Sequence, residues 1–456
     1  MPIKPATSKG TRDFSSEELA KRNHLKNILQ KAFECFGFSP IETPTFERLE
    51  TLTGVYGEEG DRLVFKILNS GDKIKKADTE SLFQGENQKF IRSVSEKALR
   101  YDLTVPFARY VAQHQNEITF PFRRYQIQPV WRADRPQHGR FQEFYQCDAD
   151  IVGERSLWQE IEVLSLYDRA FADLAVPDVV LKVNHRKILA GIAGLLGAES
   201  SLVDFTVALD KLDKIGTEGV FKELTTKGFD EQSLKILDQL LSLEGDMEDQ
   251  LNGLKKLLSK QPSGLEGIKE LEFIHTQFKD NPLQATNLKF DLTLARGLHY
   301  YTGMIVEVAP PARVKMGSIG GGGRYDDLTG VFGLKNMSGI GISFGFERIY
   351  LVMEALDLFP KTLLESPQVL FANFGGVAVQ ASYSHLHKLR NQNISCELYP
   401  TEAKLKKQLG YANAKKINKV VLIGSEELDQ KSFVLKNMET GEQSSHPLSE
   451  MVNILS

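Results

Sequence analysis

Apolar positions change their spacing several times along the chain, and each change predicts a different kind of element. Between residues 17 and 36 they recur at three- and four-residue steps, which predicts an amphipathic helix ending near Gly37. Residues 38–49 predict an extended segment interrupted by Pro40 and Pro44. Within residues 122–152, two β-branched and aromatic runs flank the turn-rich DRPQHGR, which predicts two antiparallel strands joined by a long polar loop.

The spacing also divides the chain into parts. Leu, Lys and Glu at helical spacing over residues 186–280 predict a mostly helical insertion, after which strand-like segments return at 287–295 and 303–309. Beyond Glu354, short apolar strands alternate with helical stretches, which predicts a small parallel α/β domain. We therefore expect a main domain in two parts, an insertion and a C-terminal domain, at residues 1–185, 286–360, 186–285 and 366–456 respectively.

Composition is that of an ordinary globular protein. The chain has 456 residues, 41% hydrophobic and 25% charged, which predicts two or three domains and argues against disorder. We expect neither secretion nor membrane insertion, because the chain has no apolar run of about 18 residues and no secretory signal. Three widely spaced cysteines fit a reducing cytoplasm. With a net charge of −4, any nucleic-acid surface must be local.

The predicted hairpin at 122–152 concentrates groups that could bind a ligand. Its arginines could bind phosphate oxygens two at a time, and they are Arg123, Arg124, Arg132, Arg135 and Arg140. Strand alternation puts Phe144, Gln146, Asp148 and Asp150 on one face, and Phe141, Tyr145, Cys147 and Ala149 on the other. The first face would suit a pocket that stacks a planar ring and binds a small polar ligand. A solvated sheet face with Arg–Asp pairs explains the hairpin equally well.

Glycine is dense between Gly317 and Gly345. The segment GSIGGGGRYDDLTG lacks the Lys-Ser/Thr pair of a phosphate-binding loop and the GxGxxG spacing of a dinucleotide fold. A flexible linker is one alternative, but glycine within a strand often marks close approach by a ligand or a neighbouring chain. Residues 339–348 predict a buried strand leading into a helix that begins near Arg348, from which an arginine could reach a triphosphate.

Two other segments carry weaker signals. Residues 295–303 place an arginine and two tyrosines near a strand, although a surface strand with aromatic packing would look the same. Residues 403–425 hold six lysines and no acid, which predicts a nucleic-acid contact or a solvated lysine face. The nine histidines have no metal-ligand spacing, so we expect no metal site.

Together these segments resemble the histidyl-tRNA synthetase family of class II aminoacyl-tRNA synthetases. Six pieces occur in family order, and chance similarity of all six is very improbable. They are GTRDF at 10–14, GFSPIETPTFE at 37–47, LRYDLTVPFARY at 99–110 with the hairpin, ARGLHYYTG at 295–303, GGGGRYD at 320–326 and GISFGFERI at 341–349.

The resemblance implies a fold and an activity. The fold would be α+β: a class II antiparallel sheet with helices, a helical insertion and a C-terminal α/β anticodon-binding domain. The enzyme would activate L-histidine with ATP, accompanied by Mg²⁺, and transfer the histidyl group to its tRNA. A cytoplasmic homodimer without membrane contact is implied as well.

The resemblance also assigns residues to roles. Arg132 would hold the ATP α-phosphate and act in catalysis with Arg296, which would touch both the substrate carboxylate and that phosphate. The other ATP-binding residues would be Asp134, Arg140, Phe144 and Arg348, with Phe144 stacked on adenine. Asp102, Thr104 and Gln146 would hold the α-amino group, and Asp150, Tyr300, Tyr301 and Tyr325 would surround the imidazole. The tRNA would meet Arg135, Gln137, Lys404, Lys406 and Lys407.

One position departs from the family pattern. The signature usually reads RGLDYYTG, and here His299 replaces the aspartate. Two rivals remain: a synthetase-like regulatory subunit of histidine biosynthesis, and a class II synthetase for another amino acid. The C-terminal domain with Arg132, Arg296 and Arg348 argues against the first, and the two histidine-type signatures argue against the second.

Overall fold

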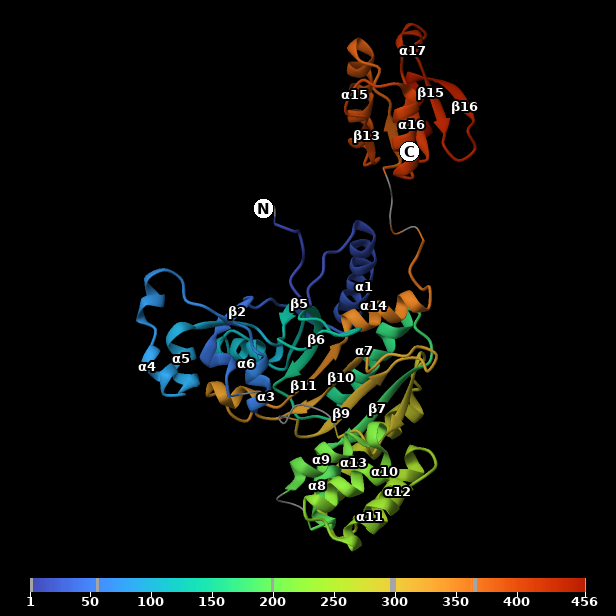
Figure 1. The fold of residues 1–456 in the computed structure, drawn as a ribbon. Coiled ribbons are helices and arrows are strands. Elements are labelled where there is room, and N and C mark those ends of the chain that lie inside the picture. The colour runs from blue at the N-terminus through green and yellow to red at the C-terminus, as the bar shows by residue number, and fades with distance from the viewer. Residues whose placement is uncertain are drawn as a thin grey trace. The chain divides into compact units, whose positions relative to one another are not determined.

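The chain folds into two compact units, Met1–Phe359 and Pro360–Ser456. We obtained the fold as a computed structural model (Figure 1). It describes residues 3–54, 57–197, 201–295, 301–361, 363 and 367–455. Each unit has its own sheet and its own core, so each is described by itself.

An eight-stranded sheet forms the centre of the larger unit (Figure 1). Its six inner strands pair antiparallel, and the two edge strands β1 and β8 pair parallel with their neighbours. This confirms the predicted antiparallel sheet and the predicted hairpin, which is β5–β6. The order across the sheet is β1 (Ser39–Pro40), β5 (Phe122–Trp131), β6 (Glu143–Val152), β11 (Gly339–Phe344), β10 (Gly320–Tyr325), β9 (Met304–Ala309), β7 (Val179–His185) and β8 (Thr286–Phe290).

Three helices lie together along this sheet: α1 (Ser16–Cys35), α7 (Trp158–Asp173) and α14 (Phe346–Ala355) (Figure 1). Helix α1 begins with a capping box, in which Ser15 caps the Glu18 N–H and the Glu18 carboxylate accepts from the Ser15 N–H. Its apolar stripe, including Leu25, Leu29 and Phe33, is fully buried. The helix predicted over 17–36 is therefore confirmed, because three- and four-residue spacing identifies a stripe that packs on a core.

A second, smaller sheet flanks the hairpin, with the order β2 (Phe46–Arg48), β4 (Lys97–Leu99) and β3 (Lys66–Ile67). Buried Arg100 joins the proline-rich segment to β5, since its guanidinium donates to the carbonyls of Thr43 at 2.6 Å and Pro129 at 2.8 Å. The nearby helical elements are α2 (Leu49–Leu52), α3 (Gly57–Leu63), η1 (Gly71–Lys76), α4 (Thr79–Phe83), α5 (Asn87–Val94), α6 (Thr104–Gln113) and η3 (Leu328–Phe332).

The insertion is helical, as the spacing predicted, and lies beyond the β7–β8 edge of the sheet (Figure 1). Its helices are α8 (Arg186–Leu195), α9 (Leu202–Leu209), α10 (Leu212–Thr226), α11 (Glu231–Leu241), α12 (Met247–Leu257) and α13 (Pro262–Asp280). The chain passes from the insertion back into the sheet at β8. There Asp168 of α7 holds the backbone, since its Oδ1 accepts hydrogen bonds from the N–H groups of Ala285 and Thr286, each at 2.8 Å.

The smaller unit contains a five-stranded sheet in the order β13 (Cys396–Leu398), β12 (Val369–Phe371), β14 (Lys419–Leu422), β15 (Ser432–Asn437) and β16 (Gln443–Pro447). The three predicted strands, β13, β12 and β14, are parallel as expected, but the unpredicted strands β15 and β16 pair antiparallel and make the sheet mixed. Strand β16 is almost entirely polar and exposed, so it leaves no apolar pattern in the sequence. Its helical elements are α15 (Gly376–Arg390), α16 (Leu405–Ala414), α17 (Ser425–Asp429), η4 (Leu448–Glu450) and α18 (Met451–Leu455).

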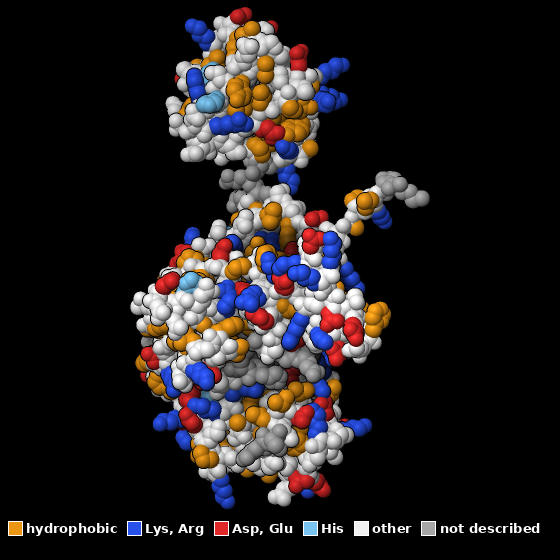
Figure 2. All heavy atoms as spheres, turned by 90° about the vertical axis from the view of Figure 1, so that its left-hand side faces the viewer, with side chains coloured by type: hydrophobic (Ala, Val, Ile, Leu, Met, Phe, Trp, Pro, Cys, Tyr) orange, Lys and Arg blue, Asp and Glu red, His pale blue; other side chains and the backbone are white. Residues whose placement is uncertain are grey.

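Surface features agree with the composition. Basic and acidic side chains are interspersed over the face of the larger unit seen in Figure 2. Among the described residues, no helix is long and apolar enough to cross a bilayer. The same residues contain no group of three or more His, Cys, Asp or Glu side chains that could hold a metal ion.

Candidate active site

Two adjoining cavities lie on the sheet where β6, β10 and β11 run side by side. The larger has a volume of about 430 Å³ and the smaller about 120 Å³. Both are lined by Arg132, Gln146, Tyr301, Gly321 and Ser343, so a ligand filling one would touch a ligand filling the other. This arrangement suits two substrates that react at their junction.

Arg132 stands between the two cavities, directly after β5. Its Nε donates to the Tyr101 carbonyl at 3.1 Å, and its Cζ lies 4.4 Å from the Tyr101 ring centroid and 5.2 Å from that of Phe144. Stacking between two rings fixes the plane of a guanidinium. The position of Arg132 at the junction is therefore set before any ligand arrives.

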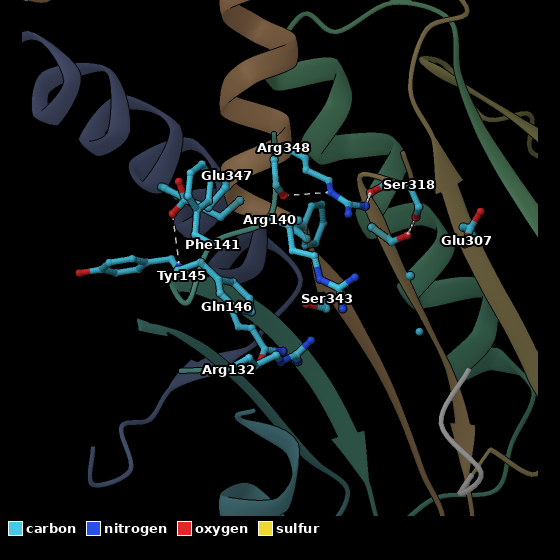
Figure 3. Close-up of a pocket in the computed structure, with 18 of the residues that line it drawn as sticks. Arg132, Arg140, Phe141, Tyr145, Gln146, Glu307, Ser318, Ser343, Glu347 and Arg348 are labelled. Atoms are coloured by element: carbon cyan, nitrogen blue, oxygen red, sulfur yellow. Dashed lines mark hydrogen bonds between the residues drawn. The ribbon is translucent and has the colours of Figure 1, made fainter. Parts of the chain in front are cut away.

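Two further arginines line the larger cavity (Figure 3). Arg140 pairs with the Asp134 carboxylate through Nε at 3.0 Å and Nη2 at 2.9 Å. Arg348, at the start of α14, donates from Nη1 to the Ser318 carbonyl at 2.7 Å. Three guanidinium groups line this cavity, and each offers the forked donors that bind phosphate oxygens.

The loop between β5 and β6 extends beyond the predicted turn segment DRPQHGR. Strand β5 ends at Trp131 and β6 begins at Glu143. Gln137 and Arg140 pair through both backbone groups and close its tip, where the side chains of Arg135 and Gln137 are exposed. Phe141 was placed on a strand face by the alternation argument, which was wrong. It precedes β6 and belongs to the loop, because pairing starts only two residues later.

The smaller cavity is organised around Asp150. Its Oδ1 accepts a hydrogen bond from the Tyr325 hydroxyl at 2.7 Å, and its Oδ2 lies 2.6 Å from Nη2 of fully buried Arg124. Gly341 on β11 leaves the space for this group, since a Cβ there would stand 2.1 Å from Oδ1 of Asp150. Burial raises the pKa of Asp150, whereas Arg124 and Tyr325 lower it.

A second carboxylate, Asp148, lies two residues away on the same strand face. Burial raises the pKa of Asp148 to about 7, and neighbouring Asp150 adds to this rise while Arg124 opposes it. Gln146 points its amide nitrogen at both Asp148 oxygens, at 3.2 and 3.4 Å. The Gln146 carbonyl oxygen is buried and has no partner among the described residues. Asp148 thus orients the Gln146 amide so that a hydrogen-bond acceptor remains for a ligand.

The remaining assigned residues fall into two groups. Asp102, Thr104, Tyr301 and Tyr325 all line the smaller cavity, and the Asp102 carboxylate accepts from the Val105 N–H at 3.1 Å. Arg296 and Tyr300, together with His299, lie outside the described residues. The structure therefore brings together Asp102, Thr104, Arg132, Gln146, Asp150, Tyr301 and Tyr325 around one cavity, and Arg132, Asp134, Arg140, Phe144 and Arg348 around the other.

The sequence placed Asp148 on the strand face of Gln146 and Asp150 but gave it no role of its own. Arg124 was expected among the phosphate-binding arginines, whereas it is buried and pairs with Asp150. Glu347 was not predicted, since its partners Arg12 and Arg22 are distant in sequence. Glu347 accepts two hydrogen bonds from Arg22, at 2.7 and 2.8 Å, and burial raises its pKa while these contacts lower it below the usual range.

In the smaller unit, the side chains of Lys404, Lys406 and Lys407 are exposed at the start of α16. None of the three has an ion-pair partner within the parts of the chain that the structure describes. Lys415 differs, because its Nζ pairs with the Glu397 carboxylate at 3.0 Å.

Comparison with known proteins agrees with this geometry. A family model described as histidyl-tRNA synthetase matches residues 79–349, and one described as an anticodon binding domain matches residues 368–456. The chain is 58% identical to a histidine--tRNA ligase of Christiangramia forsetii over 97% of both chains, and 54% identical to that of Flavobacterium johnsoniae over 97% of both. The chain belongs to the histidyl-tRNA synthetase family.

Solved structures support the same fold. The histidyl-tRNA synthetase of Nostoc sp. PCC 7120 matches with a TM-score of 0.80 at 27% identity, covering 100% of this chain and 99% of that one. A Bacillus halodurans C protein titled as an ATP phosphoribosyltransferase regulatory subunit/histidyl-tRNA synthetase has a TM-score of 0.73 at 21% identity, over 93% of this chain and 99% of that one. At that identity only the fold is shared, so the synthetase family assignment rests on the sequence relatives.

Proposed function

We propose that this synthetase activates L-histidine with ATP and passes the histidyl group to the 3′ end of its tRNA. The observation that carries the proposal is the pair of adjoining cavities, one rich in arginine and one rich in carboxylates, which meet at Arg132. In the first step the histidine carboxylate attacks the ATP α-phosphorus and releases pyrophosphate. In the second step a hydroxyl of the terminal ribose attacks the acyl carbon and releases AMP.

ATP occupies the larger cavity in this proposal. Phe144 stacks on adenine, Arg132 holds the α-phosphate at the junction, and Arg140 and Arg348 bind the terminal phosphates. Asp134 keeps Arg140 in place through two contacts at 2.9 and 3.0 Å. Fixed cations stabilise the charge that develops when the carboxylate attacks phosphorus, because they need no reorganisation during the reaction.

Histidine occupies the smaller cavity. Asp102, Thr104 and the Gln146 carbonyl oxygen accept from the α-ammonium, while Asp150 and the tyrosines Tyr300, Tyr301 and Tyr325 surround the imidazole. Arg296 bridges the substrate carboxylate and the α-phosphate. The support for the imidazole site is the Tyr325–Asp150–Arg124 chain, which holds one carboxylate in a defined orientation beside a cavity of about 120 Å³.

Magnesium accompanies ATP in this proposal. Glu307 of β9 lines the larger cavity and offers the hard oxygen donor that Mg²⁺ prefers. Mg²⁺ typically uses one or two protein carboxylates and completes its shell with phosphate oxygens and water, so one carboxylate fits this role. When bound, the ion would neutralise charge on the phosphates, and Glu307 would hold it.

The tRNA would contact both units. Exposed Arg135 and Gln137 at the tip of the β5–β6 loop would meet the acceptor end, and Lys404, Lys406 and Lys407 would meet the anticodon region. The three lysines are exposed and have no ion-pair partner among the described residues, which supports this role, because each can neutralise a phosphate and release a counterion.

The proposal includes a homodimer in the cytoplasm. Pro44 and Phe46 of the class II proline segment are exposed, with 47% of the Phe46 surface accessible. An exposed aromatic side chain beside a proline suits a partner subunit. The three cysteines are all unpaired, which fits a reducing compartment. Sedimentation of the wild-type chain and Phe46→Asp tests the dimer, because the charge should shift the equilibrium toward monomer.

Amino-acid-dependent pyrophosphate exchange tests the activity. We expect exchange with histidine and, for other amino acids, rates lower by on the order of 10⁴-fold, since buried polar groups reject ligands that leave them unpaired. Exchange with proline or threonine at a comparable rate would favour the rival synthetase. Binding of histidine without exchange or charging would favour the regulatory subunit.

A further inference from the structure

The N-terminal segment Gly10–Phe14 lies against the loop between β5 and β6. The Gly10 carbonyl accepts a hydrogen bond from the Gln142 N–H at 2.8 Å. Gly10 has a φ of 79°, and a Cβ there would stand 2.5 Å from Cγ of Gln142 and 2.9 Å from Cγ of Pro136. Backbone and side-chain contacts therefore hold this segment against both arms of the loop, and only glycine fits at the point of closest approach.

Arg12 extends from this segment to two residues that neighbour the cavity arginines. Its Nη2 donates to Oε2 of Glu347 at 2.6 Å, and its Cζ lies 3.5 Å from the centroid of the Phe141 ring. Glu347 directly precedes Arg348, and Phe141 directly follows Arg140. Glu347 and Phe141 lie beside Arg348 and Arg140 in Figure 3. One guanidinium thus contacts the chain neighbours of both Arg140 and Arg348.

The contacts of Glu347 indicate that Arg12 is not needed merely to pair this buried carboxylate. Arg22 already binds both Glu347 oxygens, at 2.7 and 2.8 Å, and 7% of its side chain is exposed. The Arg12 side chain is 29% exposed. Removal of Arg12 therefore leaves the buried carboxylate paired, whereas the contact between Glu347 and Phe141 through a guanidinium is lost.

Other contacts near the C-terminal end of the loop connect this part of the chain to α14 less directly. The Tyr145 N–H, within β6, donates to Oε1 of Glu347 at 3.3 Å. Arg140 faces the cavity and pairs with Asp134 of the same loop, so this pair does not tie the loop to α14. Arg348 donates to the Gly139 carbonyl at 3.4 Å, which is a long contact. A cation over the Phe141 ring, bonded at its other side to α14, is a stronger connection between the two elements.

We propose that Arg12 is a positioning residue that fixes the distance between Arg140 and Arg348, and so prepares the cavity for the ATP triphosphate. This inference rests on the proposed role of those two arginines in binding ATP. A triphosphate is bound well only when its cations are preplaced, and a displacement of about 1 Å can cost on the order of 10²-fold in rate. The N-terminal signature would then act at the active site without touching a substrate.

The test measures pyrophosphate exchange in the full-length chain while ATP and histidine are varied separately. We expect Arg12→Ala to lower kcat/KM for ATP roughly 10- to 100-fold, while KM for histidine changes less than about twofold. Arg12→Lys should restore part of the loss, because an ammonium keeps the charge but not the flat stacking surface. Lys9→Ala removes a neighbouring exposed positive charge and should match the wild type.

A double-mutant cycle identifies the contact responsible. Arg12→Lys and Phe141→Leu are both conservative, and their effects on kcat/KM for ATP should be strongly non-additive if the stacking acts on the cavity. Additive effects, or a normal ATP dependence in both Arg12 variants, would overturn the inference. So would equal losses for ATP and histidine with a lowered Tm, which would indicate a structural anchor only.

Arg140→Ala and Arg348→Ala test the proposed triphosphate site independently of the role of Arg12. If neither variant changes KM for ATP, the assignment of the triphosphate site is wrong. If both raise it and Arg12→Ala does not, the triphosphate site stands and the positioning role of Arg12 is wrong.

Discussion

The Tyr325 hydroxyl on β10 donates a hydrogen bond of 2.7 Å to the Asp150 carboxylate on β6, across the glycine of the intervening strand β11. The other Asp150 oxygen faces Arg124 on β5 at 2.6 Å. Four adjacent strands therefore cooperate to hold one carboxylate beside the smaller cavity. This relationship depends on strand order, which no local segment of sequence contains.

The first prediction concerns Asp150. Asp150→Asn should lower kcat/KM for histidine by roughly 10- to 100-fold, the usual effect of losing one charge-assisted hydrogen bond. KM for ATP should change little, because ATP occupies the other cavity. Steady-state exchange with each substrate varied in turn measures both. Tyr325→Phe serves as a milder companion, since it removes only the donor that orients the carboxylate. Equal losses for both substrates would contradict an imidazole role.

The second prediction concerns Asp148 and pH. Burial raises the pKa of Asp148 to about 7, above its unfolded value near 3.8. Between these two values the folded state binds more protons than the unfolded state, so stability falls as pH rises, by at most about 1.4 kcal/mol per pH unit. Asp148→Asn removes this titration. Its free energy of unfolding relative to wild type should therefore increase from pH 5 to pH 8.

Denaturant unfolding at several pH values measures that difference. Exposed Asp72→Asn is the matched control, and its difference from wild type should stay nearly flat over the same range. A flat difference for Asp148→Asn would mean that the carboxylate is already ionised at pH 5 in the folded protein.

Local signals in the sequence identified most elements of the fold. The stripe Leu25, Leu29 and Phe33 identified α1, and the two aromatic runs identified the hairpin. In both cases the spacing of apolar residues in the sequence matches the period of the element. The polar strand β16 was missed because it buries almost nothing. Antiparallel pairing of β14 with β15 makes the sheet mixed. Which strands pair depends on two segments together, so the pattern within one segment does not predict it.

The site was predictable to a similar degree. Alternation along one strand placed Gln146, Asp148 and Asp150 together. The family resemblance supplied Asp102 and Tyr325, which lie far away in sequence. The buried pairing of Arg124 with Asp150 and the buried Glu347 could not be predicted, because an Arg or Glu in sequence is ordinarily a surface residue.

The third prediction concerns Arg296, whose role comes from the family resemblance. Adenylation brings an anionic carboxylate against an anionic phosphate, and a guanidinium can contact both. Arg296→Ala should slow adenylation by on the order of 10²–10³-fold, with little change in Tm or tRNA binding. Arg296→Lys should recover only part, since an ammonium lacks the two-pronged geometry. Single-turnover rapid quench measures adenylation, and transfer from preformed histidyl-adenylate should be affected much less. A near-normal adenylation rate in Arg296→Ala would contradict this role.

The last prediction concerns the lysines at the start of α16. Substituting Lys404, Lys406 and Lys407 together by Ala should weaken tRNA binding and leave histidine-dependent exchange unchanged, because both cavities lie in the other unit. If all three neutralise phosphates, the slope of log Kd against log salt should fall by roughly 2, since each contact releases somewhat less than one counterion. Filter binding across a salt series measures the slope. The triple variant of Lys73, Lys75 and Lys76 is the control: it removes the same charge from an exposed cluster where Lys73 and Lys75 pair with acids, and it should keep the wild-type slope. The same slope in the α16 variant and the wild type would mean that these lysines form only a solvated face.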